Sequence, residues 1–207
     1  MAETNSNSRL EAFCDGVFAI ALTLLVLEIK LPPAMSVNSN AQFWDALAHM
    51  TPTVLAFLLS FVIILISWVN HHTALKLVNG SSPTFIYANG FLLLTVVFLP
   101  FPTALMGEFL FTDHAAPAVI LYCSVIAFQS VGWILLGKTA MASGLAKNEQ
   151  AKAAAVTNVR YAVYAFGVYA LLAVLAFWFP LVIAGVTAVI WVFWLFYGIR
   201  ENTQLFG

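Results

Sequence analysis

The sequence predicts an all-α integral membrane protein with six membrane-crossing helices. Of the 207 residues, 62% are hydrophobic and only 8% are charged, and there are 18 Phe and 6 Trp, which is far outside the range of a soluble domain. The long apolar stretches are continuous and lack the apolar–polar alternation of barrel strands. Because backbone polar groups in hydrocarbon must be satisfied inside their own segment, these stretches are expected to be helices.

The first three helices follow from the positions of charges and prolines. Residues 9–30 are apolar in their second half, although charged residues lie in the first half. The charge-free stretch from Ala46 to Leu75 is expected to enter the membrane near residue 53, after a mixed lead-in, 41–50, that lies along the interface. The third stretch has Pro83 in its first turn and Pro100 near its far end.

The remaining three helices lie after residue 115. Tyr161–Ile199 is uncharged for 39 residues, too long for one crossing of about 20 residues, and Pro180 is expected to divide it. The polar stretch 137–155 is interpreted as a loop or short helix and not as a second domain. The chain 1–207 is therefore expected to be a single six-helix transmembrane domain. Its expected helices are 9–30, 53–75, 83–106, 115–136, 158–179 and 181–199.

Lysine and arginine predict the orientation. With six crossings and both termini in the cytoplasm, seven basic residues fall on the cytoplasmic side and only Lys30 falls outside, a strong positive-inside signal. The seven are Arg9, Lys76, Lys138, Lys147, Lys152, Arg160 and Arg200. We therefore expect a protein integral to the plasma (inner) membrane.

Other functional classes find little support in the sequence. Net charge is −1, which indicates neither a nucleic-acid-binding surface nor a funnel for acidic substrates. The chain has no G-x-S-x-G, no H-E-x-x-H and no glycine-rich phosphate loop, so an enzyme is disfavoured. Its two cysteines, Cys14 and Cys123, have no metal-type spacing and are interpreted as packing residues, and no metal site or cofactor is expected.

The opening stretch, RLEAFCDGVFAIALTLLVLEIK, has two different sides. Asp15 points roughly opposite to Ile20 and, being costly to expose to lipid, is expected to face protein or water. The other side is a stripe within about 60° of one line: Arg9, Phe13, Gly16, Ile20, Thr23, Leu24 and Leu27. Composition and periodicity alone leave this stripe open to ordinary helix packing or lipid contact.

A cluster of polar residues lies near the end of the second expected helix, at a depth similar to that of Asp15. The segment SWVNHHTAL carries Trp68, Asn70, His71 and His72, and an Asp15–His contact is geometrically reasonable. The histidine pair has three open readings: interfacial polarity, a structural clasp between helices, or a proton relay or metal site.

These two segments resemble a known family. RLEAFCDGVFAIALTLLVLEI is similar to the signature of the transmembrane protein 175 family, endolysosomal-type potassium channels and their prokaryotic relatives, whose first helix carries R-x-x-x-F-S-D before an apolar run. Arg9, Phe13 and Asp15 match the motif, and residues 68–72 resemble the end of the family's second helix. Cys14 stands where the motif has Ser, and a thiol is a weaker hydrogen-bond partner than a hydroxyl.

The resemblance implies a potassium channel of the single-repeat prokaryotic type, which forms a homotetramer with a pore lined by the first helix. No TVGYG filter occurs in this chain. The implied pore-lining and selectivity positions are Ile20, Thr23, Leu24 and Leu27, with Glu28 at the outer mouth and K⁺ as the permeant ion. Apolar rings in a narrow segment are hard to wet and form a hydrophobic gate. The implied structural or gating network is Arg9, Phe13, Asp15, Trp68, His71 and His72.

A proton-coupled transporter or proton pathway is the alternative function, using Asp15 with His71 or His72. No inverted repeat or pair of Gly/Pro-interrupted helices, both typical of transporter sites, is evident in the sequence. A non-transporting membrane scaffold, in which the whole stripe is helix packing, is a third possibility.

Overall fold

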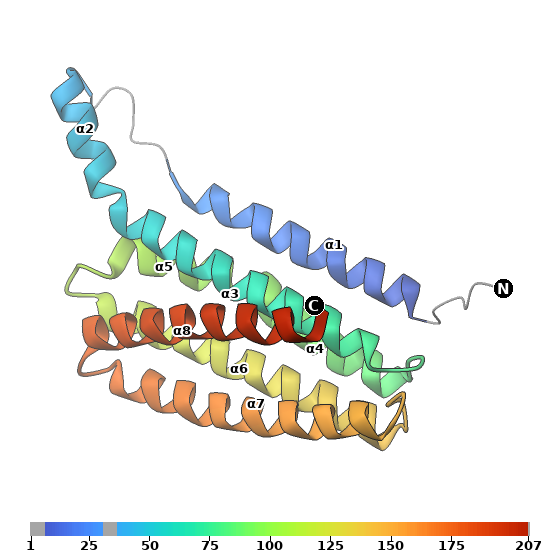
Figure 1. Ribbon diagram of the computed structural model, residues 1–207. Coiled ribbons are helices and arrows are strands. Elements are labelled where there is room, and N and C mark those ends of the chain that lie inside the picture. Colours follow the sequence, from blue (N-terminus) through green and yellow to red (C-terminus); the bar gives the residue numbers. More distant parts are fainter. Residues whose placement is uncertain (1–6, 31–36, 207) are drawn as a thin grey trace.

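The apolar stretches form helices that run between two ends of the molecule (Figure 1). A computed structural model describes residues 7–30 and 37–206, with side chains as far as Leu195. Its helices are α1 (Ser8–Leu24), η1 (Leu25–Glu28), α2 (Asn40–His49), α3 (Thr51–Lys76), α4 (Pro83–Phe98), α5 (Pro100–Phe109), α6 (Ala115–Ala142), α7 (Glu149–Leu175) and α8 (Pro180–Phe206).

Short polar side chains begin three of these helices. The Ser39 and Ser82 hydroxyls and the Asn148 side-chain oxygen each accept a hydrogen bond from a backbone N–H in the first turn of α2, α4 and α7, respectively. These groups satisfy N–H donors that have no partner inside the helix. The starts of α2, α4 and α7 are thus encoded locally.

Prolines interrupt or start the apolar helices. Pro100 has no N–H to donate, and the helix that begins at Pro83 breaks at Leu99 and continues as α5 to Phe109. This helical stretch ends at Phe109, three residues after the end at residue 106 that the sequence predicts. Near the C-terminus, α7 ends at Leu175 and α8 begins at Pro180.

The polar stretch 137–155, expected to be a loop or short helix, consists mostly of the ends of two long helices joined by a short turn. The helix α6 extends to Ala142 and α7 begins at Glu149, nine residues before the expected start at 158. Ala, Lys, Glu and Gln are good helix formers, so the polarity of this stretch marks emergence from the apolar region and not a break in the helix. The turn is made at Gly144, whose φ of +62° suits glycine, and Leu145 N–H donates to Ala140 C=O in a Schellman motif.

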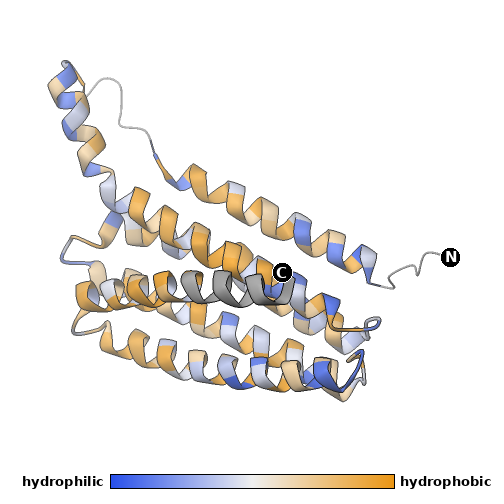
Figure 2. Cartoon of the chain, in the orientation of Figure 1, coloured by the Kyte–Doolittle hydropathy of each residue, from blue (hydrophilic) through white to orange (hydrophobic). Residues whose placement is uncertain are grey.

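Five helical stretches are long and apolar enough to cross a membrane within the part of the chain that the structure describes. They are Ser8–Glu28, Thr51–Lys76, Pro83–Phe109, Ala115–Ala142 and Glu149–Leu175. The first part of α8, Pro180–Leu195, is a shorter apolar helix. In Figure 2 the middle of the bundle is hydrophobic, and hydrophilic residues gather at its ends and on α2.

One end of the bundle, here called the basic end, holds the start of α1 and the α3–α4 and α6–α7 turns (Figure 1). The basic residues that lie at or toward it are Arg9, Lys76, Lys138, Lys147, Lys152 and Arg160. The Arg200 side chain lies outside the described residues. At this end the two turns are joined by backbone hydrogen bonds, from Asn79 N–H to Leu145 C=O at 2.7 Å and from Lys147 N–H to Leu77 C=O at 3.0 Å.

Close backbone approach packs the centre of the bundle. The helix α6 contacts α4, α5, α7 and α8, and a side chain at Gly132 would lie 2.9 Å from the Cα atom of Leu92. Small residues permit such contact between helices, which supplies the packing energy that association in lipid requires.

Candidate pore-lining helix and its polar anchor

The helix α1 buries one face against the rest of its own chain and leaves the opposite face open. Cys14, Phe18, Ala21 and Leu25 are spaced four, three and four residues apart, so they share one face, and each is at most 1% exposed. This face packs on α3 and α4. The helix is therefore attached to the bundle along a single edge, as Figure 1 also shows.

The stripe predicted from the sequence lies on the open side. Ile20, Leu24 and Leu27 are 58%, 38% and 68% exposed within one chain, and Thr23 is exposed beside them. Seven residues make about two helical turns, so Ile20 and Leu27 lie on the same side of the helix. This side is offset by about half a turn from the buried face, so the stripe and the buried face are roughly opposite. It is thus available for contact with another molecule.

The C-terminal half of this stripe is wound more tightly than an α-helix. Leu25–Glu28 is a 3₁₀ helix with three residues per turn, so Leu24 and Leu27 lie one above the other along its side. The Thr23 hydroxyl donates to the Ile20 carbonyl at 2.9 Å, so the lone pairs of its exposed oxygen are not used by this hydrogen bond. The stripe thus presents apolar side chains with one hydroxyl oxygen among them.

Two contacts fasten the first turns of α1 to the end of α3. Trp68 Nε1–H donates to Asp15 Oδ1 at 2.8 Å, and His72 Nδ1 lies 3.1 Å from Glu11 Oε1. The Trp68 and His72 rings are stacked with their centroids 6.0 Å apart. Because the helices are antiparallel, moving one turn along α1 from Glu11 to Asp15 corresponds to moving one turn back along α3.

A second chain of contacts lies deeper and includes α4. His71 Nε2 and Asn89 Oδ1 are 2.7 Å apart, and Asn89 Nδ2 donates to Cys14 Sγ at 3.0 Å. His71, Asn89 and Cys14 are at most 1% exposed. The His71 ring also contacts the Phe18 and Trp133 rings, with centroids 5.3 Å and 6.3 Å apart. A single amide thus connects three helices, and the thiol in place of the motif's serine accepts one of its hydrogen bonds.

The contact expected between Asp15 and a histidine is replaced by other pairs. Trp68 lies on the side of α3 that faces α1 and donates a hydrogen bond to the Asp15 carboxylate. His72, one turn away, contacts Glu11, and the His71 ring contacts Asn89. Asp15 and the polar residues of α3 lie at the same depth to within one turn, but depth alone does not distinguish side chains on neighbouring faces of α3.

Three further expected site residues lie apart from these contacts within a single chain. Arg9 is exposed, and Phe13 is 62% exposed on the same side as the stripe. Glu28 is half-buried at the end of the 3₁₀ helix, at the opposite end of the bundle from Asp15.

The polar anchor is the set of side chains joined by these contacts: Glu11, Cys14, Asp15, Trp68, His71, His72 and Asn89. Two of them, Asn89 and Glu11, have no site role predicted from the sequence. Asn89 is a polar amide inside the apolar run 77–107, and an isolated polar residue in a membrane helix signals a specific partner. Glu11 lies one turn before Asp15, so the same face of α1 carries both carboxylates. Across the described residues, no group of three His, Cys, Asp or Glu side chains is placed to hold a metal ion.

Comparison with known proteins gives consistent matches. A profile described as "Endosomal/lysosomal potassium channel TMEM175" matches residues 9–100. A potassium channel of Streptomyces collinus is 37% identical over 179 residues, which cover 84% of this chain and 84% of that protein. A potassium channel of Chamaesiphon minutus is 47% identical over 123 residues, 59% of this chain and 60% of that protein.

The fold has a solved counterpart, and animal proteins match in part. The crystal structure of a lysosomal potassium-selective channel TMEM175 homolog from Chamaesiphon minutus superposes with a TM-score of 0.82 at 35% identity, covering 93% of this chain and 97% of that one. The endosomal/lysosomal proton channel TMEM175 of Gallus gallus is 31% identical over 147 residues, which make up 68% of this chain and 29% of that protein.

Apolar helices of membrane-spanning length, with one helix attached along a single edge, define an integral membrane protein of the polytopic α-helical class. The matches make the assignment more specific. The chain belongs to the TMEM175 family, which is a family of ion channels and not of enzymes.

Proposed function

We propose that this protein is a potassium-selective cation channel in which four copies of the chain surround one pore. The two bacterial relatives and the solved structure are named as potassium channels, which supports the choice of ion. One subunit's α1 cannot enclose a conduit, but four copies around a closed symmetry axis can. The permeant K⁺ ion needs no cofactor in this scheme.

The observation that carries the proposal is the two-sided character of α1. Its buried face and its polar anchor both attach it to its own subunit, and the apolar stripe faces away from that subunit. A helix held in this way can present Ile20, Leu24 and Leu27 to the symmetry axis while its back remains fixed. Thr23 adds a ring of four hydroxyl oxygens within the apolar rings.

The stripe would form a short hydrophobic constriction. From Ile20 to Leu27 the helix rises about 12 Å, given about 1.5 Å per residue up to Leu24 and about 2 Å per residue in the 3₁₀ segment. Apolar rings of this length dewet readily, so conduction depends on small changes in radius. The Thr23 oxygens would replace part of the water shell of an ion, and the Glu28 carboxylates would attract cations to the outer mouth.

In the proposed topology α8 is the sixth membrane-crossing helix, so that both termini lie in the cytoplasm. The basic end would then face the cytoplasm of the cell whose plasma membrane holds the channel, in agreement with the positive-inside rule. The contacts of Asp15, Trp68, His71 and His72 would hold the inner end of the pore helix, with Arg9 and Phe13 near the neighbouring subunit.

The proposal is tested by potassium flux through vesicles that contain the purified protein. Leu27→Ser or Ile20→Ser should raise the basal flux and reduce the preference for K⁺ over Na⁺, because a hydroxyl makes the constriction easier to wet. Leu171→Ser is the matched control: this leucine is 58% exposed on α7, as Ile20 is on α1, and should be neutral. Equal behaviour of the α1 and α7 variants, in tetramers of normal mass, would contradict the pore assignment.

Proton conduction is the second candidate, because animal relatives are named as proton channels. Asp15 is hydrogen-bonded to Trp68 and not to a histidine, so a direct relay between Asp15 and a histidine gives proton conduction no support. A pH-sensitive dye inside the same vesicles separates the candidates. Proton uptake at zero potassium gradient, unaffected by external K⁺, would favour the proton pathway, whereas potassium flux without a coupled pH change favours the potassium channel.

A further inference from the structure

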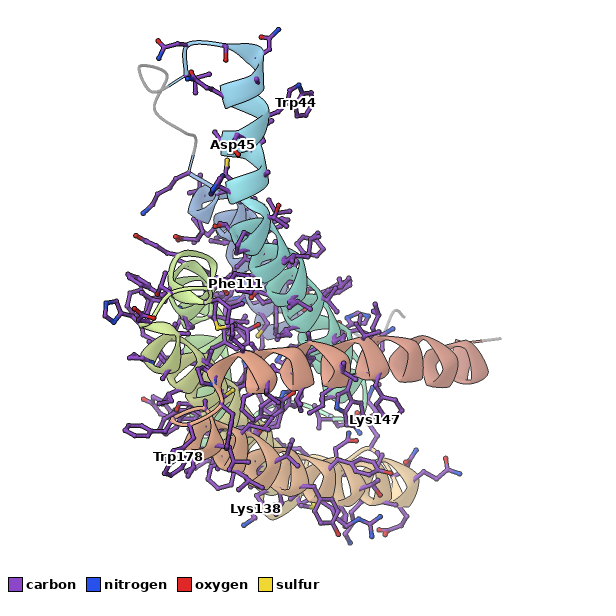
Figure 3. All side chains as sticks on the ribbon, turned by 90° about the vertical axis from the view of Figure 1, so that its left-hand side faces the viewer. Trp44, Asp45, Phe111, Lys138, Lys147 and Trp178 are labelled. Atoms are coloured by element: carbon purple, nitrogen blue, oxygen red, sulfur yellow. The ribbon has the colours of Figure 1, made fainter. Side chains whose placement is uncertain are left out.

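The helix α2 stands apart from the rest of the protein. None of its residues, Asn40–His49, is buried, and it contacts the remainder of the chain mainly through α3, from which it is separated by a bend at Met50. Figure 3 views the bundle from the end at which α2 lies, opposite the basic end. In this view α2 extends sideways from the bundle and does not continue along the direction of the membrane-crossing helices.

The residues of α2 are segregated into two sides. Phe43, Trp44 and Leu47 fall on one side, as the helical repeat requires, and Phe43 and Trp44 are 45% and 70% exposed. Gln42, Asp45 and His49 fall on the other side, where Asp45 and His49 are one turn apart with His49 Nδ1 3.6 Å from Asp45 Oδ2. Figure 3 shows the Trp44 and Asp45 side chains on this projecting helix.

The position of α2 determines which surroundings these sides meet. The apolar span of α3 begins at Thr51, directly after α2, so the helix starts where a membrane-crossing segment reaches the bilayer surface. A helix that leaves the bundle sideways at this level runs along the surface. Amphipathic helices in such a position place aromatic residues at the boundary between headgroups and acyl chains and their polar side in water.

We propose that α2 binds the phospholipid surface of the leaflet opposite the basic end. Phe43 and Trp44 enter the boundary between headgroups and acyl chains, and Asp45 and His49 face water. The helix thereby anchors the start of α3 at a fixed depth in the bilayer, a role that does not depend on which ion the protein conducts.

Spin-label accessibility in phosphatidylcholine vesicles tests this arrangement on the full chain. Trp44→Cys and Asp45→Cys are labelled separately with a nitroxide. The native Cys14 and Cys123 are both 0% exposed and remain unlabelled. Leu171→Cys calibrates a lipid-facing position, and Lys147→Cys calibrates a water-facing one.

The expected result is a difference between neighbouring positions. The label at 44 should collide severalfold more often with oxygen than with a water-soluble nickel chelate, and the label at 45 should show the reverse. Equal aqueous exposure at both positions would overturn the proposal, because α2 would then project into water. Shielding of position 44 from both reagents would also overturn it, because a neighbouring subunit would then cover the helix.

Intrinsic fluorescence provides a measurement that keeps Trp44 in place. Phospholipids brominated near the headgroup should quench a component of the unmodified protein's emission, and that component should be absent in Trp44→Phe. An identical quenched fraction in the two proteins would contradict the proposed depth of α2.

Discussion

The hydrogen bond between Trp68 and Asp15 is predicted to couple α1 energetically to α3. The perturbations are Asp15→Asn, which removes the negative charge, Trp68→Phe, which removes the N–H donor but keeps an aromatic ring, and the two together. Each single change also alters other contacts, so the quantity of interest is the coupling free energy of the double-mutant cycle.

The geometry fixes the expected size of this coupling. The donor and acceptor are 2.8 Å apart and partly buried, and hydrogen bonds to a charged group contribute about 1.5–3 kcal/mol in soluble proteins. Double-mutant cycles in a membrane protein average about 0.6 kcal/mol, with a maximum near 1.7, because the unfolded chain in the membrane also finds partners. A charged acceptor places this pair in the upper part of that range, so we expect about 1–1.5 kcal/mol.

The assay is reversible unfolding of the purified protein in mixed micelles, followed by circular dichroism. The control cycle combines Asp15→Asn with Trp178→Phe, because Trp178 is 63% exposed and lies toward the other end of the bundle. Distant pairs are additive to within about 0.5 kcal/mol. If the Asp15–Trp68 cycle were as additive as the control cycle, the anchoring role of this hydrogen bond would be refuted.

Three other substitutions have expected outcomes in the same unfolding assay. Gly132→Ala should destabilise by about 1–3 kcal/mol, because the new methyl group would meet the backbone of α4 at 2.9 Å, while Gly167→Ala, with no atom within 4 Å, should be neutral or stabilising. Cys14→Ser should stabilise by about 0.5 kcal/mol, because a hydroxyl is a better acceptor for the Asn89 amide. Gly144→Ala should destabilise by about 1 kcal/mol, because its φ is +62°.

Each of these expectations has an outcome that would contradict it. Equal effects of the alanine changes at positions 132 and 167 would mean that the α4–α6 contact is looser than described. A loss of stability in Cys14→Ser would show that the volume of the sulfur matters more than its hydrogen bond. An unchanged midpoint in Gly144→Ala would mean that the turn after α6 relaxes freely.

The helical class and the two-sided character of α1 could be predicted from the sequence because they depend on local pattern. Charge-free stretches and prolines identified where most helices lie, and the rotation per residue separated Ile20 from Asp15. The extent of α6 and α7 was misjudged because polarity was taken as the end of a helix. Helix propensity, which is high through Glu149–Ala155 after the turn, was the better guide.

The partners of the polar side chains could not be predicted in the same way. Choosing between Trp68, His71 and His72 for Asp15 requires the rotation of α3 about its own axis, which is set by packing against several helices at once. Asn89 was visible as an isolated amide, but its position between Cys14 and His71 depends on how closely α4 approaches α1. Such three-helix contacts are a property of tertiary packing and not of any one segment.

The backbone hydrogen bonds between the α3–α4 and α6–α7 turns have a mechanical consequence. They join two helical hairpins into one stiff base, through Asn79 and Lys147 on opposite turns, whereas the first turns of α1 are held by side-chain contacts of Glu11 and Asp15 with α3. A small displacement of α1 therefore strains its side-chain contacts and the packing of one face, while the same displacement of α4 or α6 would also have to deform the joined turns. The helix α1, whose open side carries Ile20 and Leu27, is therefore easier to shift relative to this base than α4 or α6.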